Sequence, residues 1–127
     1  MIVAIGTDIV DIHRIRAALE NPATGSRFRD RLFTPGEIAY CSRRRRCHES
    51  YAARFAAKEA VIKALGGKAV RWLDIDIRRQ EEAPEIHLSG SAAALANELG
   101  IDRWHLSLSH SEDLAIAYVI AEASRRS

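Results

Sequence analysis

The sequence has few cysteines and prolines, the residues that constrain many small proteins through disulfides and rigid turns. It contains two cysteines and three prolines in 127 residues, and two cysteines are too few for a disulfide framework. Cys41, Cys47 and His48 also lack the number and spacing of ligands that a structural zinc site requires. Long uncharged runs are absent, because Asp8 and Asp11 directly follow the apolar start. This argues against a secretory signal and a membrane span, so we expect a reduced, cytoplasmic protein.

The length and composition predict one globular domain over residues 1–127. Single domains commonly have roughly 50–250 residues, and this chain has 47% apolar and 28% charged residues. These proportions are ordinary for a protein that buries a hydrophobic core. We therefore expect the chain to fold without disulfides or a structural metal.

Charge is unevenly distributed along the chain. Residues 1–63 hold 12 Lys or Arg against 7 Asp or Glu, a net charge of +5, whereas residues 64–127 hold 7 against 10, a net charge of −3. The basic side chains are mostly arginines, which gather at Arg27, Arg29 and Arg31 and again at 43–46. The forked guanidinium group suits carboxylate and phosphate partners. The N-terminal half therefore carries either a docking surface for an acidic partner or a well-solvated basic face.

The residue pattern predicts helices and strands without a regular alternation, which indicates the α+β class. Thr34, Pro35 and Glu37 have the spacing of a capping box that starts a helix. An alanine-rich helix over 48–65 should end at Gly66-Gly67. The other expected elements are a buried, β-branched strand at 2–12, a helix at 13–20, strands at 72–79 and 85–88, a helix from Ser89 or Ser91 to Gly100, and a hairpin of 104–110 and 114–122 turned at 111–113.

Two acidic residues are expected at the edge of the core. Alternation places Asp8 on the apolar face of the first strand, where a carboxylate is costly unless a cation meets it. On the long helix, Glu59 projects about 40° from Phe55, taking about 100° per residue, and Lys63 follows one turn later. A partner arginine for Asp8 and a surface ion pair between Glu59 and Lys63 explain this pattern most simply. Alternatively, Asp8 and Glu59 hold one Mg²⁺, which typically binds one or two carboxylates together with water and phosphate.

Cationic residues near these acids suit phosphate groups. Lys63, Arg54 and Lys58 lie on the same helix as Glu59 and are candidates to meet phosphate oxygens. His110 closes the apolar face of the strand at 104–110, where a histidine is more often an edge residue than a ligand. The pattern by itself is compatible with a phosphate-handling metal site but favours the simpler ion pairs.

Four motifs resemble one enzyme family over nearly the whole chain. They are GTDIVDI at 6–12, FTPGE at 33–37, RFAAKEAVIKALG at 54–66 and SLSHS at 107–111. In order and spacing they are similar to the holo-acyl-carrier-protein synthases, a branch of the 4′-phosphopantetheinyl transferases. The resemblance implies a compact domain whose mixed, largely antiparallel sheet packs on a long central helix. It also implies Mg²⁺-dependent transfer of 4′-phosphopantetheine from coenzyme A to a serine of apo-acyl carrier protein in fatty acid biosynthesis, with release of 3′,5′-ADP.

The resemblance also implies roles for individual residues. Asp8 and Glu59 become the Mg²⁺ ligands, and Glu59 and Lys63 the catalytic residues. The family's small members form a homotrimer with sites between subunits and bind neither nucleic acid nor membrane. The positions matching coenzyme A contacts are Arg54, Lys58, Lys63, Gly66 and His110, and those matching carrier-protein contacts are Arg14, Arg27 and Arg31.

The chain departs from the family pattern at two positions. Larger relatives carry a third acid two residues after the first, where this chain has Val10, so water is expected to complete the metal shell. A Gly-Lys-Pro-like turn is replaced by Glu82-Ala83-Pro84. The proton acceptor for the serine is either Glu59 or a metal-bound water, and the simplest role for Glu37 is the capping box alone.

Two other classes of protein explain part of the pattern. A nucleic-acid-binding module would account for the arginines at 43–46, but few aromatics lie among them, and it leaves the acid pair unexplained. A Mg²⁺-dependent hydrolase of small phosphate esters would account for Asp8 and Glu59, but it leaves the basic surface unexplained.

Overall fold

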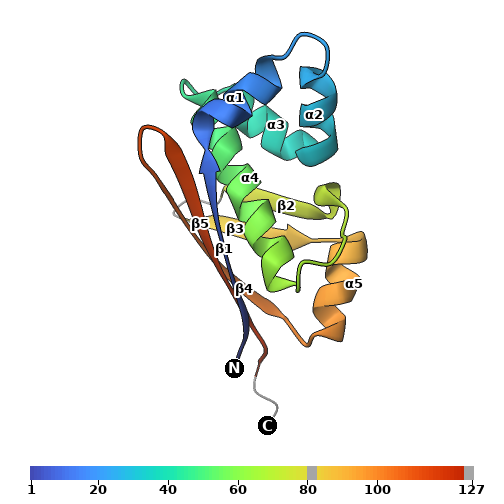
Figure 1. The fold of residues 1–127 in the computed structure, drawn as a ribbon. Coiled ribbons are helices and arrows are strands. Elements are labelled where there is room, and N and C mark those ends of the chain that lie inside the picture. Colours follow the sequence, from blue (N-terminus) through green and yellow to red (C-terminus); the bar gives the residue numbers. More distant parts are fainter. Residues whose placement is uncertain (80–82, 125–127) are drawn as a thin grey trace.

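The computed structural model describes residues 1–79 and 83–124, and Figure 1 shows its ribbon with the long helix α4 at the centre. The mixture of helices and antiparallel strands confirms the predicted α+β class. Among the described residues, no helix is long and apolar enough to cross a bilayer. The elements are β1 (Ile2–Asp11), α1 (Ile12–Glu20), α2 (Gly25–Leu32), α3 (Pro35–Ser42), α4 (Cys47–Ala64), a 3₁₀ turn η1 (Trp72–Asp74), β2 (Ile75–Arg79), β3 (Pro84–Leu88), α5 (Gly90–Glu98), β4 (Arg103–His110) and β5 (Leu114–Glu122).

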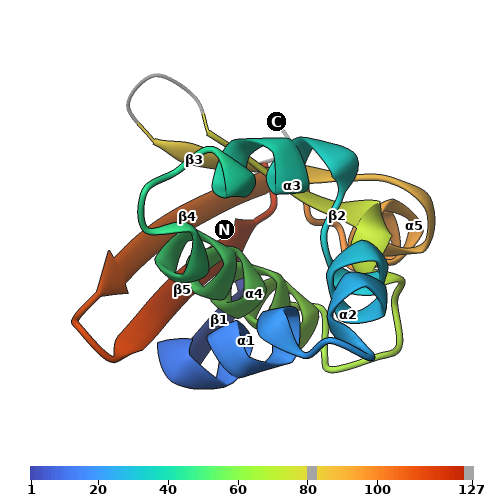
Figure 2. The ribbon, with the colours of Figure 1, turned by 90° about the horizontal axis from the view of Figure 1, so that it is seen from above.

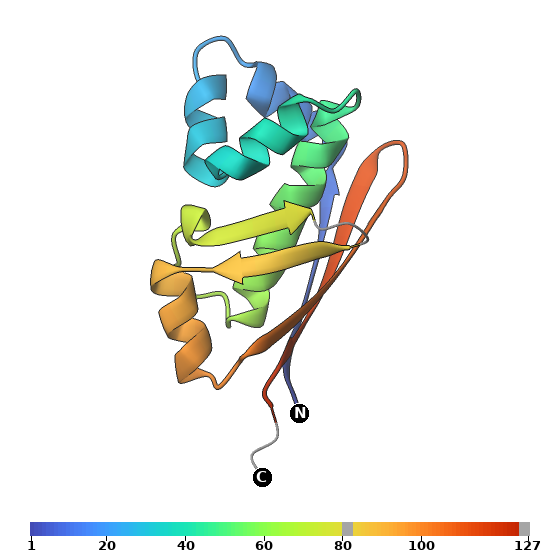
Figure 3. The ribbon, with the colours of Figure 1, turned by 180° about the vertical axis from the view of Figure 1, so that it is seen from behind.

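The strands form two antiparallel groups around α4. β1, β5 and β4 make a three-stranded sheet in that order, and β2 pairs with β3. α4 runs along one face of the three-stranded sheet, with the β2–β3 pair beside it (Figure 3). Asp8 on β1 stands opposite Ala117 on β5, which in turn stands opposite Leu108 on β4. β5 therefore separates the sheet edge that carries Asp8 from the edge formed by β4.

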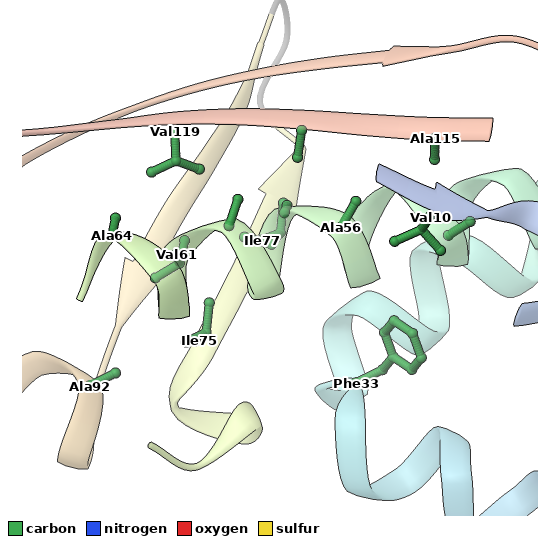
Figure 4. Close-up of a cluster of buried hydrophobic side chains, with 14 of the residues drawn as sticks. Val10, Phe33, Ala56, Val61, Ala64, Ile75, Ile77, Ala92, Ala115 and Val119 are labelled. Carbon is green, nitrogen blue, oxygen red and sulfur yellow. The ribbon is translucent and has the colours of Figure 1, made fainter. Parts of the chain in front are cut away.

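Small residues allow α4 to lie very close to this sheet. A side chain at Gly6 on β1 would overlap the carbonyl oxygen of Ala60 on α4, so the strand needs glycine at this position. Figure 4 shows Ala56, Val61 and Ala64 of α4 packed between β5 and β2. The buried alanines of this contact are Ala52, Ala56, Ala57, Ala60 and Ala64 on α4 and Ala115, Ala117 and Ala121 on β5.

The outer face of the three-stranded sheet is apolar and uncovered in the single chain. Ile5 and Ile9 on β1 are 65% and 62% exposed, and Tyr118 on β5 is 55% exposed. The prediction of a buried first strand is therefore correct only for its inner face, which contains Gly6 and Val10. A continuous β-branched run cannot show whether the second face is covered by the same chain or by another one.

A buried ion pair joins three elements on the other side of α4. Lys58 donates a hydrogen bond of 2.5 Å to Glu37 Oε1 and one of 2.6 Å to the carbonyl of Leu32. The second oxygen of Glu37 accepts from the backbone N–H of Ile77 at 2.9 Å, and Glu37 also completes the predicted capping box with Thr34. Burial raises the pKa of Glu37 and lowers the pKa of Lys58, and their mutual attraction opposes both shifts. Glu37 therefore does more than cap α3, because it ties α3 to α4 and β2.

The sequence analysis missed one helix and misplaced the start of one strand. Helix α2 was not predicted, because its sequence is basic and contains few apolar residues. It is held in place by Phe28, which stacks on Phe55 with ring centroids 6.3 Å apart. The strand expected from residue 72 begins at Ile75, after the 3₁₀ turn. Of the unusual turn at Glu82-Ala83-Pro84, Glu82 lies outside the described residues, so that expectation stays a prediction.

Replacing one partner of the Glu37–Lys58 pair should strongly destabilise the fold. Lys58→Met leaves a buried carboxylate without its cation, and loss of one partner of such a pair typically costs about 3–5 kcal/mol. The double variant Glu37→Gln/Lys58→Met should lose clearly less than the sum of the two single losses. Free energies of unfolding from urea titrations check this, and simple additivity would contradict a direct coupling of the two side chains.

Candidate active site

Strand β1 and the last turns of α4 bring Asp8, Glu59 and Lys63 together. The ammonium group of Lys63 donates to Asp8 Oδ1 at 2.9 Å and to the carbonyl oxygen of Thr7 at 3.0 Å. Among the ion pairs of residues 1–79 and 83–124, Lys63 is joined to Asp8 and not to Glu59. The surface ion pair between Glu59 and Lys63 is therefore not formed, and the cation that meets Asp8 is a lysine rather than an arginine.

Glu59 lies in an environment that disfavours its negative charge. Its pKa is raised, first by partial burial and then by the nearby charge of Asp8, while Lys63 acts in the opposite direction. Two carboxylates held close together at the edge of a core are stabilised by a cation between them. The arrangement thus has the electrostatics of a cation site.

The donor set suits Mg²⁺ better than a transition metal. Carboxylate oxygens are the ligands that Mg²⁺ prefers, and it usually retains several waters or substrate oxygens. Within the described part of the chain, no group of three or more His, Cys, Asp or Glu residues is arranged to hold a metal. Val10, where larger relatives are expected to carry a third acid, is 8% exposed on the same strand face and offers no ligand atom. Asp8 and Glu59 therefore fit an ion whose other ligands are water and phosphate.

A hollow of about 320 Å³ lies beside this pair. Asp8 and Glu59 line one part of it, and Arg14 from α1 lines another. Its apolar wall is formed by Phe28 and Phe55, a feature that the sequence analysis missed because the packing of α2 on α4 was not predicted. We call this space the acidic hollow.

A second space, of about 500 Å³, is strongly basic and lies on the other side of α4. Its lining includes Arg54, His110 and the residues at the end of α3, and Figure 2 shows α1 and α3 on opposite sides of α4. Arg54 is only 5% exposed, and its guanidinium group lies over the ring of Tyr40 at 4.3 Å. We call this space the basic hollow. Its arginines are Arg44, Arg45, Arg46, Arg54 and Arg79.

Arg54 carries an unusual unpaired donor. Its buried Nε has no hydrogen-bond partner among the described residues. Buried polar groups are nearly always paired, so an exception marks a place where a ligand or water is expected. Tyr40 and Arg79 were not predicted as site residues, since their distance from Arg54 in the sequence gives no sign of contact.

The predicted site residues thus fall into three groups. Asp8, Glu59, Lys63 and Arg14 meet at or beside the acidic hollow, whereas Arg54 and His110 meet at the basic hollow. Lys58 belongs to neither: its side chain is fully buried against Glu37, so a contact with coenzyme A does not fit its position. The remaining predicted residues, Gly66 at the end of α4 and Arg27 and Arg31 on α2, are exposed.

Comparisons with known proteins identify the class. The model of the 4′-phosphopantetheinyl transferase superfamily matches residues 4–119, and the chain belongs to this superfamily. Within it, the chain is similar to the holo-[acyl-carrier-protein] synthase of Anaeromyxobacter sp. (strain K), with 47% identity over 126 residues and 98% of both chains covered. The family expected from the four motifs is therefore confirmed.

Solved structures agree with this assignment. The holo-ACP-synthase from Plasmodium yoelii superimposes with a TM-score of 0.84 at 30% identity, covering 98% of both chains. The holo-(acyl-carrier-protein) synthase from Bacillus anthracis in complex with CoA (3′,5′-ADP) gives a TM-score of 0.77 at 36% identity, covering 98% of this chain and 99% of that one. Neither competing class, the nucleic-acid-binding module or the phosphate-ester hydrolase, is supported by these matches.

Removing the charge of either acid should weaken Mg²⁺ binding. Asp8→Asn and Glu59→Gln keep the shape of the side chains but remove a ligand charge, and we expect at least about a tenfold loss of affinity, since changes even behind a metal's ligands cost this much. Calorimetric titration with Mg²⁺ in the presence of coenzyme A measures it. Glu98→Gln, an equal charge change at an exposed position on α5, is the control. Unchanged affinity in either site variant would show that the acid does not hold the ion.

Proposed function

We propose that this protein transfers the 4′-phosphopantetheine arm of coenzyme A to a serine of apo-acyl carrier protein in a Mg²⁺-dependent reaction. The observation that carries the proposal is the cluster of Asp8, Glu59 and Lys63 beside the acidic hollow. Membership of the phosphopantetheinyl transferase superfamily gives this cluster its chemistry. The reaction belongs to fatty acid biosynthesis and takes place in the cytoplasm.

The chemistry is a phosphoryl-type transfer. The serine oxygen forms a bond to the β-phosphorus of coenzyme A, the bond from that phosphorus to the bridging oxygen breaks, and 3′,5′-ADP leaves with the electron pair. Asp8 and Glu59 would hold Mg²⁺, which when bound neutralises charge on the diphosphate. The serine proton passes to Glu59 or to a water molecule.

Lys63 contributes a positive charge to this step. Its ammonium group lies at the same carboxylate that would hold the metal, which places it within reach of a diphosphate bound there. Negative charge grows on the departing 5′-phosphate as the bond breaks. A cation that meets this charge lowers the barrier, because its attraction is greatest in the transition state.

The basic hollow suits the nucleotide end of coenzyme A. A 3′-phosphate needs fixed cations, and Arg54 offers an unpaired buried N–H beside His110 and the neighbouring arginines. The two hollows share no lining residue. One is lined by residues of α1 and the other by residues at the end of α3, and these two helices lie on opposite sides of α4 (Figure 2). One coenzyme molecule can use both kinds of contact when a second copy of the chain supplies the basic hollow.

The exposed apolar face supports such an assembly. On the outer surface of β1 and β5, Ile5 stands opposite Ile120 and Ile9 opposite Ile116, which makes the apolar surface continuous across the two strands. Contiguous exposed apolar surface of this kind commonly marks a protein–protein contact. We propose a homotrimer with its active sites between subunits.

The acidic hollow also provides a docking place for the carrier protein. Arg14 lines it beside Asp8, and the apolar wall of Phe28 and Phe55 completes it. Arg27 and Arg31 are exposed on α2, the helix that also carries Phe28. A partner with acidic and apolar side chains around its serine fits this combination of cations and aromatic rings.

Mass spectrometry of the carrier protein tests the proposed reaction. After incubation of apo-acyl carrier protein with coenzyme A, Mg²⁺ and this protein, the carrier should gain the mass of one phosphopantetheine group. A carrier in which the acceptor serine is replaced by alanine is the matched control and should gain nothing. If no carrier gains mass with or without Mg²⁺, the proposed function is wrong.

Charge reversal at Arg14 should affect the carrier and spare the coenzyme. Arg14→Glu places a negative charge on the docking surface, so KM for the carrier should rise at least about tenfold, an effect that salt screens over about 8 Å. KM for coenzyme A should stay nearly constant. Arg103→Glu, at the start of β4, is the matched control. Equal increases in both KM values would contradict the docking assignment.

A further inference from the structure

The carboxylate of Asp8 is the expected partner of two cations, the ammonium group of Lys63 and Mg²⁺. Its carboxylate already accepts a hydrogen bond from Lys63 at 2.9 Å, and the same carboxylate would be a ligand of Mg²⁺. We propose that Lys63 couples the binding of the metal to the binding of coenzyme A: it opposes Mg²⁺ alone and gives way when the diphosphate of the coenzyme arrives. This inference rests on the proposed function, because it needs both the metal and the coenzyme at this site.

The charges at the site support this coupling. Asp8 and Glu59 together carry two negative charges, and Lys63 compensates for one of them through its ion pair with Asp8. A divalent cation added to this group must share Asp8 with the ammonium group and leaves an excess of positive charge. Like charges at such short range repel each other, most strongly where water is partly excluded. Mg²⁺ alone therefore binds against the charge of Lys63.

The diphosphate of coenzyme A reverses this balance. Its oxygens neutralise the excess positive charge and offer Lys63 a new acceptor in place of Asp8. The coenzyme thus relieves the repulsion between Mg²⁺ and Lys63, and the bound metal in turn adds positive charge that attracts the diphosphate. Because coupling between two ligands is reciprocal, Mg²⁺ should strengthen coenzyme binding by the same factor by which the coenzyme strengthens Mg²⁺ binding.

Lys63 has the freedom that this role requires. Its side chain is 52% exposed, whereas the Asp8 side chain is 15% exposed, so the lysine is the partner that can swing away. Its ammonium group donates to Asp8 and to the carbonyl of Thr7. Lys58, five residues earlier on the same helix, is fully buried and held by Glu37 and Leu32, and cannot move in this way.

Calorimetric titration with Mg²⁺, with and without saturating coenzyme A, tests the coupling. Lys63→Gln keeps a donor for Asp8 but removes the charge. Without coenzyme it should bind Mg²⁺ at least about threefold more tightly than the unmodified protein, the order expected for one partly exposed ion pair. The strengthening of Mg²⁺ binding by coenzyme A should shrink by a similar factor or more. Titration of Mg²⁺ into coenzyme A alone is subtracted.

Two variants complete the design. Lys63→Arg keeps the positive charge, so its Mg²⁺ affinity without coenzyme should stay within about twofold of that of the unmodified protein. Lys68→Gln makes the same charge change as Lys63→Gln at an exposed position after α4 and should leave Mg²⁺ binding unchanged. If Lys63→Gln binds Mg²⁺ alone no more tightly than the unmodified protein, or if Lys68→Gln has the same effect, the coupling role is wrong. The modification of the carrier by the unmodified protein is a separate measurement, so the proposed function stands or falls independently.

Discussion

The close approach of α4 to β1 at Gly6 is the constraint on which the site depends. Because a side chain at Gly6 would overlap the carbonyl oxygen of Ala60, the helix and the strand can lie this near only with glycine in the strand. Glu59 directly precedes Ala60, and Lys63 follows it by three residues. The contact that builds the core therefore also sets how close these two side chains come to Asp8. A larger residue at Gly6 would push the helix away and separate the acids, even if the protein still folded.

α4 has four different roles, and each belongs to a different side of the helix. Its buried alanines pack in the core beside the three-stranded sheet, Glu59 and Lys63 face the edge formed by β1, and Arg54 faces the basic hollow. Lys58 is directed to Glu37 and holds α3 and β2 in place. A single amphipathic pattern of apolar and polar positions does not describe this helix, since two of its charged residues are as buried as its alanines.

The sequence supports prediction where one local rule decides the outcome. The capping box at Thr34 and Glu37, the alanine-rich helix ending at Gly66-Gly67 and the final hairpin were predicted because short-range preferences specify them. Strand alternation and helical periodicity placed Asp8 and Glu59 at the edge of the core, but their assignment as a pair of metal ligands came from the family resemblance. The burial of Lys58 could not be predicted, because it depends on a carboxylate 21 residues away in the sequence. Helix α2 was missed for a related reason: its stability comes from Phe28 packing on Phe55 rather than from its own basic sequence.

The two hollows and the exposed sheet face point to the same arrangement. A protein that leaves Ile5, Ile9 and Tyr118 uncovered gains free energy by burying them against another copy. The sheet edge with Asp8 and the edge with His110 are separated by β5, so one chain presents its carboxylates and the arginines of the basic hollow in different directions. Closed association of identical chains repeats both surfaces around an axis and can bring the acidic hollow of one copy beside the basic hollow of the next. In the proposed assembly, coenzyme bound between two copies would stabilise their contact as well as the fold of each, so that assembly and catalysis would be linked by mass action.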